Sequence, residues 1–274
     1  MMNFSVLMSV YTKENPEYVD RAFRSICDEQ SIKPQQIVLV EDGRLNEGLY
    51  SVIQKWKSIL GDTLKSVPLA ENMGLGTALK IGLENCDYEI VARMDTDDIA
   101  SPDRFEKQLY FLEENPHISV VGSFITEFEG DEQNIYAKRV LPQEPERLSA
   151  FAKRRNPLNH MTVMFVKNDV LSVGNYIPFL GFEDYYLWIR MLKAGKQIAN
   201  LPMFLVNARA GAAMLGRRGG LGYAITEYKL QREFLRIGFI GILDFMFNVF
   251  VRFSTRITPH TVRTIFYKKL LRKS

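Results

Sequence analysis

Short apolar runs alternate with amphipathic helical patterns through the first half of the chain. The apolar runs are Phe4–Val10, Ile37–Val40, Leu64–Leu69, Glu89–Met94 and Ile118–Phe124, and the helical patterns are Tyr18–Glu29, Leu49–Leu60, Gly76–Leu83 and Ser101–Glu114. The last pattern is expected to begin with Ser101 as its N-cap and Pro102 at its first position. This alternation predicts βαβ units, and therefore an α/β fold with a mainly parallel central sheet flanked by helices.

Polar residues follow three of the predicted strands. The segments are Ser9-Val10-Tyr11, Glu41-Asp42-Gly43 and Asp95-Thr96-Asp97-Asp98. In open parallel sheets, ligands bind beyond the carboxyl ends of the strands. Each segment alone is typical of a turn, and Asp-Gly in particular is a strong turn dipeptide. Three such segments at one edge of a sheet predict a binding site.

The segment Asp95–Asp98 places three acids in four positions. Carboxylates that lie close together raise each other's pKa unless a cation sits between them. Mg²⁺ and Mn²⁺ prefer oxygen ligands of this kind, commonly one or two carboxylates. An acidic turn ahead of a helix is the alternative, but it does not explain why Arg93 precedes the acids in an apolar strand. We therefore expect a divalent cation, Mn²⁺ or Mg²⁺, at these acids.

Charge is distributed unevenly between a body and a C-terminal tail. Residues 1–210 carry 23 Lys/Arg and 29 Asp/Glu, whereas residues 211–274 carry 12 Lys/Arg and 3 Asp/Glu. The tail contains an apolar, aromatic run, Phe239–Phe253, that is shorter than the ~20 residues needed to span a membrane. Basic, aromatic and amphipathic sequence is typical of a helix in a membrane interface, and a helix packed on the body is the alternative. We expect one domain at 1–210 and a helical, membrane-interfacial extension at 211–274.

The chain has two cysteines, Cys27 and Cys86, and its N-terminus shows neither the basic segment nor the cleavage site of a signal peptide. A secreted chain of this length usually carries more cysteines, in pairs. These observations favour a cytoplasmic location. Together with the basic tail, they predict peripheral attachment to the inner face of the plasma membrane.

Five segments carry a family resemblance, in the order SVLMSVYTKENPEYVDRAFRSICDEQ, QIVLVEDGR, ENMGLGTALKIGL, VARMDTDDIASPDRFEKQ and FLGFEDYYLWIRMLKAGKQIANLP. Over residues 4 to about 205, the chain resembles the family 2 glycosyltransferases of bacterial surface-polysaccharide biosynthesis, which include O-antigen, capsule and exopolysaccharide enzymes. The resemblance implies a GT-A fold, a nucleotide-diphospho-sugar donor, a divalent cation and inversion at the anomeric carbon.

The resemblance also implies roles for the residues at the strand ends. It makes Asp97 a metal ligand and Asp95 a contact to both donor and metal, with Asp98 in support of either. The expected contacts to the donor nucleotide are Ser9, Tyr11, Asp42, Asn72, Arg93 and Asp95. The resemblance implies that the acid after the second strand binds uracil, and Asp42 suits this role because a carboxylate accepts a hydrogen bond from the ring N–H. The family's preference and Asp42 together favour a UDP-sugar over a GDP- or dTDP-sugar. A plain turn at Asp42 and helix capping at Asn72 are the alternatives.

Glu183 and Asp184 open an amphipathic segment, Phe182–Ala194, in the second half of the chain. The resemblance makes Asp184 the general base that takes the proton of the acceptor hydroxyl, and Glu183 a contact to acceptor hydroxyls. Acids that complement the dipole of a helix N-terminus are the alternative. His160, in the polar segment Asn156–His160, is either an acceptor contact or a satisfied core residue.

The leading interpretation is an inverting, metal-dependent hexosyltransferase, with a polyprenyl-diphosphate-linked saccharide as its expected acceptor. Arg217 and Arg218, in a glycine-rich loop, are expected either to clamp a diphosphate or to form a basic surface loop. A sugar-phosphate nucleotidyltransferase or a D-x-D phosphotransferase is the alternative function. Both are disfavoured, because their nucleotide loop or D-x-D motif usually follows the first strand, where this chain has Tyr11–Asn15. Nucleic-acid binding is disfavoured because the body is acidic.

Overall fold

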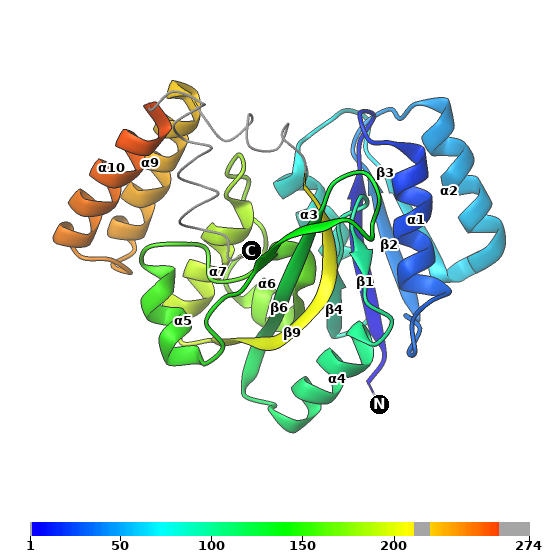
Figure 1. The fold of residues 1–274 in the computed structure, drawn as a ribbon, viewed down its shortest axis with the longest axis horizontal. Coiled ribbons are helices and arrows are strands. Elements are labelled where there is room, and N and C mark those ends of the chain that lie inside the picture. Colours follow the sequence, from blue (N-terminus) through cyan, green and yellow to red (C-terminus); the bar gives the residue numbers. More distant parts are fainter. Residues whose placement is uncertain (1, 211–219, 258–274) are drawn as a thin grey trace.

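The computed structural model describes residues 2–210 and 220–257. Within these residues, nine strands form one sheet with helices on both faces (Figure 1). The strands are β1 (Phe4–Val10), β2 (Gln36–Glu41), β3 (Leu64–Pro68), β4 (Ile90–Arg93), β5 (Ile99–Ala100), β6 (Ile118–Phe128), β7 (Ile135–Arg139), β8 (Met164–Val166) and β9 (Gln197–Arg209). The helices are α1 (Pro16–Cys27), α2 (Glu47–Leu60), α3 (Leu75–Glu84), α4 (Arg104–Glu114), α5 (Pro145–Ala152), α6 (Lys167–Ser172), α7 (Glu183–Lys193), α9 (Leu221–Arg236) and α10 (Ile242–Ile257).

Strands β1 to β4 form the parallel half of the sheet. β1 pairs in parallel with β2 and β4, and β2 pairs in parallel with β3. The predicted βαβ units are confirmed, because α1, α2 and α3 each connect two of these strands. The other half is mixed, since β8 runs antiparallel to β4 and β6 whereas β9 runs parallel to β6. The run Ile118–Phe124 predicted β6, but the mixed pairing of this half was not predicted, because the clear alternation of apolar runs and helical patterns ends near residue 125.

Two apolar cores hold the helices on the two faces of the sheet. On one face α1, α2 and α4 pack over β1 and β2, and the ring of Phe23 stacks on that of Trp56 with centroids 5.4 Å apart. On the other face α3 and α7 pack over β1, β4 and β8, with Leu79, Leu187 and Trp188 fully buried. Burying a side chain of this size stabilises the fold by roughly 1.5–3 kcal/mol. These cores fix the strand ends that carry the polar segments.

The carboxyl ends of β1, β2 and β4 lie at the same edge of the sheet. The backbone N–H of Asp42 donates to the carbonyl of Val10 (2.8 Å). The hydroxyl of Thr96, within the acidic segment, donates to the carbonyl of Ser9 (3.3 Å). These bonds bring the three polar segments together, which confirms that part of the prediction.

Two element boundaries differ from the prediction. α4 begins at Arg104 and not near Ser101, because residues 101–103 form a turn closed by the hydrogen bond from the Arg104 N–H to the Ser101 carbonyl (3.1 Å). The Ser101 hydroxyl donates to the Asp103 carboxylate (2.6 Å) and does not cap the helix. β6 continues beyond Phe124 to Phe128, because it pairs there with β7 and β9.

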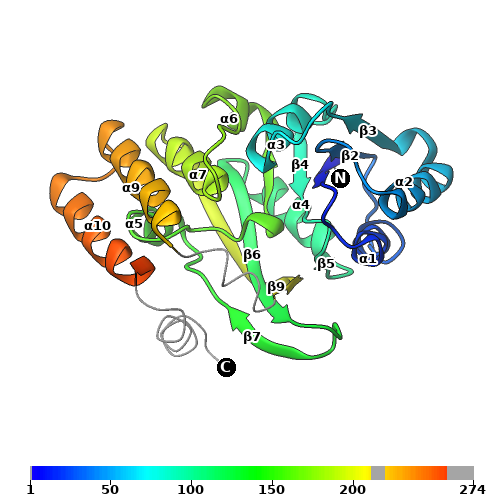
Figure 2. The same ribbon diagram turned by 90° about the horizontal axis from the view of Figure 1, so that it is seen from above.

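α9 and α10 form a helical hairpin at one end of the molecule (Figures 1 and 2). α9 packs on α7 through an aromatic cluster in which the ring centroids of Tyr185 and Phe234 lie 5.0 Å apart. The predicted division at residues 210 and 211 falls between β9 and α9, and Arg217 and Arg218 lie outside the described residues. Among the helices that the structure describes, none is long and apolar enough to cross a membrane.

Candidate functional site

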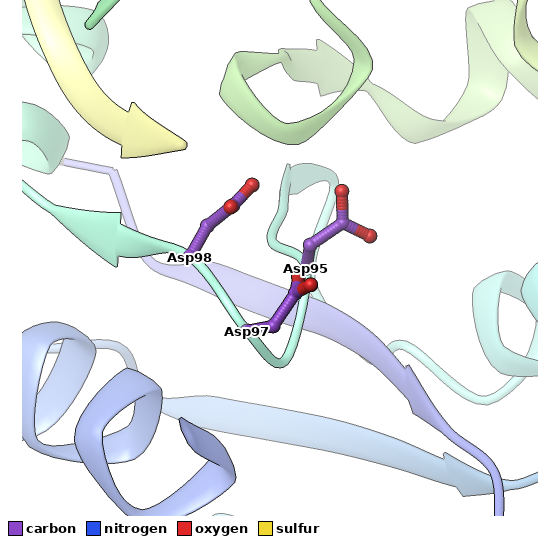
Figure 3. A group of neighbouring side chains, drawn as sticks. All are labelled: Asp95, Asp97 and Asp98. Atoms are coloured by element: carbon purple, nitrogen blue, oxygen red, sulfur yellow. The ribbon is translucent and has the colours of Figure 1, made fainter. Parts of the chain in front are cut away.

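Three acids gather on the loop that connects β4 to β5. One carboxylate oxygen from each of Asp95, Asp97 and Asp98 lies within 4.8 Å of the others, and the three side chains point to the same side of the loop (Figure 3). Asp98 is buried, whereas the Asp95 side chain keeps 31% of its surface exposed. Opposite oxygens on one Mg²⁺ ion lie about 4.2 Å apart, so a small inward shift of these side chains would bring them to the distances of a single-cation site.

Burial and mutual repulsion raise the pKa values of two of these acids. Burial, followed by the charge of Asp95, raises the pKa of Asp97 to about 6. Burial, followed by the charges of Asp97 and Asp95, raises the pKa of Asp98 well above its ordinary value. A bound cation would remove this repulsion, and an all-oxygen donor set suits Mg²⁺ or Mn²⁺. The residues present therefore fit the divalent cation that the sequence predicts.

Arg93 lies at the end of β4, behind the acids. Its side chain is 2% exposed and forms an ion pair with Asp95. Its Nε and Nη1 atoms are buried and find no hydrogen-bond partner in the part of the chain that the structure describes. Its positive charge also reaches Glu183, His160 and Tyr176. Arg93 therefore lies between the acids of the β4–β5 loop and the start of α7, and its Nε and Nη1 groups can still donate hydrogen bonds.

Arg209, at the end of β9, holds the acidic loop from another direction. Its backbone N–H donates to the Asp98 carboxylate (2.7 Å), and its Nε donates to the Asp97 carbonyl (3.2 Å). Its guanidinium lies over the rings of Tyr18 (3.7 Å) and Phe128 (4.5 Å). The sequence analysis missed Arg209 because its partners on the loop lie 111 and 112 positions earlier in the chain.

Glu14 is a further acid at the cluster that the sequence analysis missed. Its carboxylate accepts a hydrogen bond from the hydroxyl of Thr96. Burial, with the charges of Asp97 and Asp95 acting in the same direction, raises the pKa of Glu14 to about 8 despite this hydrogen bond. Its N–H donates to the carbonyl of Tyr11 (3.1 Å), a half-buried residue just beyond β1. Its place in the loop after the first predicted strand gave no signal of this role, because its partner Thr96 lies 82 positions later.

Asp42 holds the loop in front of α3. Its carboxylate accepts hydrogen bonds from the N–H groups of Met73 (2.7 Å) and Gly74 (3.0 Å), and Asn72 Nδ2 donates to its carbonyl (3.2 Å). Gly43 has φ +82°, so the turn considered as an alternative is present. Each carboxylate oxygen keeps a second lone pair, so Asp42 can still accept a hydrogen bond from a ligand. Its contact to a nucleotide stays a prediction.

Glu183 and Asp184 form the first turn of α7. Asn156 Nδ2 donates to Asp184 Oδ2 (2.6 Å) and orients that carboxylate. Burial, followed by the charge of Asp184, raises the pKa of Glu183 to about 7. A Cβ atom on Gly76 would lie 3.3 Å from the Cβ of Glu183, so the first turns of α3 and α7 are in close contact. The loop held by Asp42 therefore lies near the acids of α7.

His160 begins a short 3-10 turn, His160–Thr162, ahead of β8. Its Nε2 lies 3.0 Å from the hydroxyl of Tyr176, and its ring centroid lies 6.1 Å from that of Trp188. Burial, followed by the charge of Arg93, holds the pKa of His160 well below its ordinary value, so the imidazole is neutral at pH 7. These contacts favour the core interpretation, and an acceptor contact stays a prediction.

The candidate site residues form two groups that meet at Arg93. The first group lies at the ends of β1, β2 and β4 and comprises Ser9, Tyr11, Asp42, Asn72, Asp95 and Asp97. The second group lies at the start of α7 and in the turn before β8, and comprises His160, Glu183 and Asp184. The charge of Arg93 reaches members of both groups. This arrangement can hold an anionic ligand on one side and a neutral hydroxyl beside a carboxylate on the other.

Relatives of known family share nearly the whole length of the chain. The sequence profile of the family described as Glycosyl transferase family 2 matches residues 5–174. The chain is 42% identical to an uncharacterized glycosyltransferase of Haemophilus influenzae, over 99% of this chain and 100% of that protein. It is 40% identical to the amylovoran biosynthesis glycosyltransferase AmsE of Erwinia amylovora, over 97% of this chain and 98% of the relative. It is 36% identical to the UDP-Gal:alpha-D-GlcNAc-diphosphoundecaprenol beta-1,3-galactosyltransferase of Escherichia coli, over 98% of this chain and 97% of the relative.

Solved structures share the fold. TarS 1–349 from S. aureus, in complex with UDP-GlcNAc, matches with a TM-score of 0.67 at 19% identity, over 98% of this chain and 76% of that chain. The mannosyltransferase PcManGT from Pyrobaculum calidifontis, in complex with GDP-Man and Mn²⁺, matches with a TM-score of 0.67 at 16% identity, over 98% and 76% of the two chains. The GT-A-like fold that the resemblance implied is confirmed. The chain is a glycosyltransferase of the kind used in bacterial polysaccharide biosynthesis, and it belongs to glycosyl transferase family 2.

Proposed function

We propose that the protein is an inverting glycosyltransferase that moves a sugar from a UDP-sugar to a hydroxyl of a lipid-linked saccharide. The observation that carries this proposal is the meeting, at buried Arg93, of the acidic cluster Asp95–Asp98 with the oriented carboxylate of Asp184. The name of the Escherichia coli relative, which states a UDP-Gal donor and a diphosphoundecaprenol-linked acceptor, supports the same substrates. TarS, which was solved with UDP-GlcNAc, supports the donor class.

Asp184 is the proposed general base. Its carboxylate, oriented by Asn156, takes the proton of the acceptor hydroxyl while the hydroxyl oxygen forms its bond to the anomeric carbon. The bond from that carbon to the diphosphate breaks on the opposite face, and its electron pair leaves with UDP, so the configuration inverts. Glu183 has a pKa of about 7, so its carboxyl group can donate or accept hydrogen bonds to acceptor hydroxyls near neutral pH.

Asp95 and Asp97 are the proposed ligands of a divalent cation, with Asp98 in support. A bound Mn²⁺ or Mg²⁺ would neutralise negative charge on the departing diphosphate. The unpartnered Nε and Nη1 of Arg93 are suited to donate hydrogen bonds to the donor beside that site. Donors fixed in a buried position stabilise developing charge more strongly than water does, since they need no reorganisation.

The proposed nucleotide contacts lie at the ends of the first two strands. Asp42 keeps lone pairs that would accept a hydrogen bond from the ring N–H of uracil, and Tyr11, half-buried just beyond β1, would stack on the base. Asn72 is exposed on the loop that Asp42 holds, and the half-buried Ser9 precedes the end of β1 and contacts Thr96. All four residues lie on the sheet edge that carries the acidic cluster.

The proposed location is the inner face of the plasma membrane, with residues 211–274 as the attachment. The excess of basic over acidic residues in this region suits a leaflet rich in anionic lipid. Removing residues 242–274 keeps Phe239 and Ile240, which belong to the cluster between α7 and α9, and is expected to release the protein from the membrane fraction. A truncated protein that still pellets with membranes would contradict this location.

The test is calorimetric titration with UDP, GDP and dTDP in the presence and absence of Mn²⁺, followed by assays of sugar transfer. We expect UDP to bind in a Mn²⁺-dependent way, and Asp97→Asn to remove that dependence. Asp184→Asn should retain UDP binding and lower the transfer rate by roughly 10²–10⁴-fold, the usual contribution of a general base. Asp62→Asn, at an exposed acid after α2, is the matched control. If no nucleoside diphosphate binds with Mn²⁺, the proposed function is wrong.

A further inference from the structure

α10 lies against the rest of the molecule with its polar side. Asn248, which is 2% exposed, donates to the carbonyl of Lys153 (2.8 Å). Asp244 accepts a hydrogen bond from Arg154 (2.7 Å), and Arg252 pairs with a buried acid of α9. Asp244, Asn248 and Arg252 are four positions apart and therefore share one face of the helix. This polar face docks onto α9 and the segment after α5.

The opposite side of α10 is apolar and exposed to solvent. Six residues between 39% and 80% exposed form this side, namely Ile242, Leu243, Met246, Phe247, Phe250 and Val251, and we refer to them as the α10 apolar face. They occur in pairs that repeat every four positions, which places them along one side of the helix. A surface helix of a globular protein normally buries such a stripe against the core. In α10 this stripe faces solvent, while Phe245 packs inward together with the polar residues.

Within the part of the chain that the structure describes, the position of α10 leaves this face accessible. In both views of the molecule α10 is the outermost element of the hairpin, with α9 between it and α7 (Figures 1 and 2). Exposed apolar surface of this extent, rimmed by polar residues, marks an interaction site more often than it occurs by chance on a monomer.

A basic segment borders the α10 apolar face. Lys153, Arg154 and Arg155 follow α5 and are exposed, and the guanidinium of Arg154 lies over the ring of Phe247 at 4.3 Å. The sequence beyond residue 257, which lies outside the described residues, holds five Lys/Arg and no acid. An apolar helix face bordered by basic residues is complementary to a surface of anionic lipids, which offers acyl chains next to phosphates.

We propose that the α10 apolar face inserts into an anionic lipid surface and that Lys153 and Arg155 bind lipid phosphates beside it, while Arg154 holds α10 through Asp244. This inference rests on the proposed membrane location and identifies the surface that makes the contact. A second copy of the chain fits this face less well, because a two-fold contact would bring the basic segments of both copies into one interface. Residues 258–274 also fit it less well, because they are basic like the segment they would contact.

A short stretch of chain connects the α10 apolar face to the proposed base. Arg154 contacts Phe247 and Asp244, and Asn156, two positions later, donates to Asp184. The position of α10 on the lipid therefore also sets the height of the first turn of α7 above the lipid headgroups. This geometry suits an acceptor whose hydroxyl is presented close to the membrane surface.

The test is co-sedimentation of the full chain with vesicles of phosphatidylcholine alone or mixed with phosphatidylglycerol. The wild type is expected to bind the mixed vesicles and to bind the neutral vesicles more weakly. Leu243→Glu with Phe250→Glu should lower the partition coefficient by roughly tenfold or more per substitution, because each withdraws one large apolar side chain from lipid. Ile59→Glu, at an exposed residue of α2, is the matched control and should bind as the wild type does.

Binding of the double variant at wild-type strength, or failure of the wild type to bind the mixed vesicles, would overturn the inference. A dimer of the wild type in sedimentation velocity that is absent for the double variant would also overturn the inference. In that case a second copy of the chain would occupy the α10 apolar face. The uncharged pair Leu243→Gln and Phe250→Gln replaces the Glu pair if that variant does not fold. Hydrolysis of UDP-sugars with Mn²⁺, measured without vesicles, should be equal in all variants. If hydrolysis is absent throughout while vesicle binding follows the pattern above, the proposed function fails and this inference stands.

Discussion

At the scale of single residues, two buried arginines differ in how their hydrogen-bond donors are used. Arg104 is fully buried, and its three nitrogens donate to Gln108 (3.1 Å), to the Sδ of Met94 (2.9 Å) and to the carbonyl of Arg93 (2.6 Å). Arg93 is paired with Asp95 but leaves Nε and Nη1 without partners. A buried donor without a partner lowers stability by about 1–3 kcal/mol. This difference supports the proposal that Arg93 binds the donor, whereas the satisfied donors of Arg104 serve the fold.

This difference predicts unequal effects of the same substitution at the two positions. Arg104→Met should lower the free energy of unfolding by about 2–4 kcal/mol, because it removes satisfied buried hydrogen bonds. Arg93→Met should lower it by less, because Nε and Nη1 of Arg93 make no hydrogen bond that would be lost, and Asp95, which loses its ion-pair partner, is partly exposed to water. Its kcat/KM for transfer should fall by ~10²-fold or more. Urea denaturation measures the free energies of unfolding, and transfer assays measure kcat/KM. An equal loss of stability in the two variants would show that Arg93 is structural.

His160 predicts a pH dependence of stability. Its pKa in the folded protein lies well below its ordinary value, chiefly because it is buried. Below pH ~6.5 the unfolded chain therefore binds a proton at this residue that the folded protein does not bind, and folding loses stability as the pH falls. In a comparison of the wild type with His160→Gln, the contributions of the other titrating groups to the pH dependence of stability cancel. The wild type should lose up to about 1.4 kcal/mol per pH unit relative to the variant between pH 6 and 5 in urea denaturation. Parallel curves would mean that His160 is protonated in the folded protein.

At the scale of secondary structure, the sequence predicts those helices and strands that a local pattern of apolar residues specifies. The strands β1 to β4 and the helices α1 to α4 all coincide with apolar runs or helical periodicity. The strands β5, β7 and β9 were not predicted. β5 has only two residues, and β9 contains Pro202 and three exposed positions in succession, so neither carries a clean alternation. Their pairing depends on β6 and on contacts distant in the sequence.

The residues of the candidate site likewise divide into those that a local motif predicts and those that only tertiary contacts bring to the site. The acids Asp95, Asp97 and Glu183 were found because each belongs to a contiguous motif at an element end. Glu14 and Arg209 were missed because their contacts to the acidic loop span 82 and 111 positions, and no local pattern records such a contact. Their burial beside the acids, which follows from tertiary packing, is what makes them part of the site.

The turn after β2 lies against the loop before α3, and this contact predicts a further effect of substitution. Gly43 has φ +82°, and a Cβ there would lie 2.6 Å from the backbone nitrogen of Asn72. Gly43→Ala should therefore lower the free energy of unfolding by about 2–4 kcal/mol and weaken nucleotide binding, because the loop held by Asp42 must move. Gly61→Ala is the matched control, since Gly61 also has positive φ (+56°) but a Cβ there would meet nothing within 4 Å. It should cost only about 1 kcal/mol, the strain of the backbone conformation. Equal losses of stability in thermal denaturation would rule out the close contact.

At the scale of the whole molecule, the acidic loop joins the two halves of the chain. The loop follows β4 in the parallel half, and its Asp98 is held by the backbone of Arg209 at the end of β9 in the mixed half. Glu14, after β1, reaches the same loop through Thr96. Charge repulsion among these acids therefore acts across the interface between the halves, and any ligand that relieves it stabilises the complete fold.

This placement predicts that Mn²⁺ and Asp97→Asn each raise global stability and that their effects do not add. At pH 7.5, without metal, Asp97→Asn should raise the free energy of unfolding, because it removes a charge that contributes to the raised pKa values of Asp98 and Glu14. With Mn²⁺ at a hundred times its dissociation constant, the wild type should gain about 2.7 kcal/mol and the variant much less. The order of stability should therefore reverse on adding Mn²⁺, as measured by urea denaturation before and after EDTA treatment. Asp62→Asn should follow the wild type in both conditions. Equal stabilisation of all three proteins by Mn²⁺ would place the cation elsewhere on the molecule.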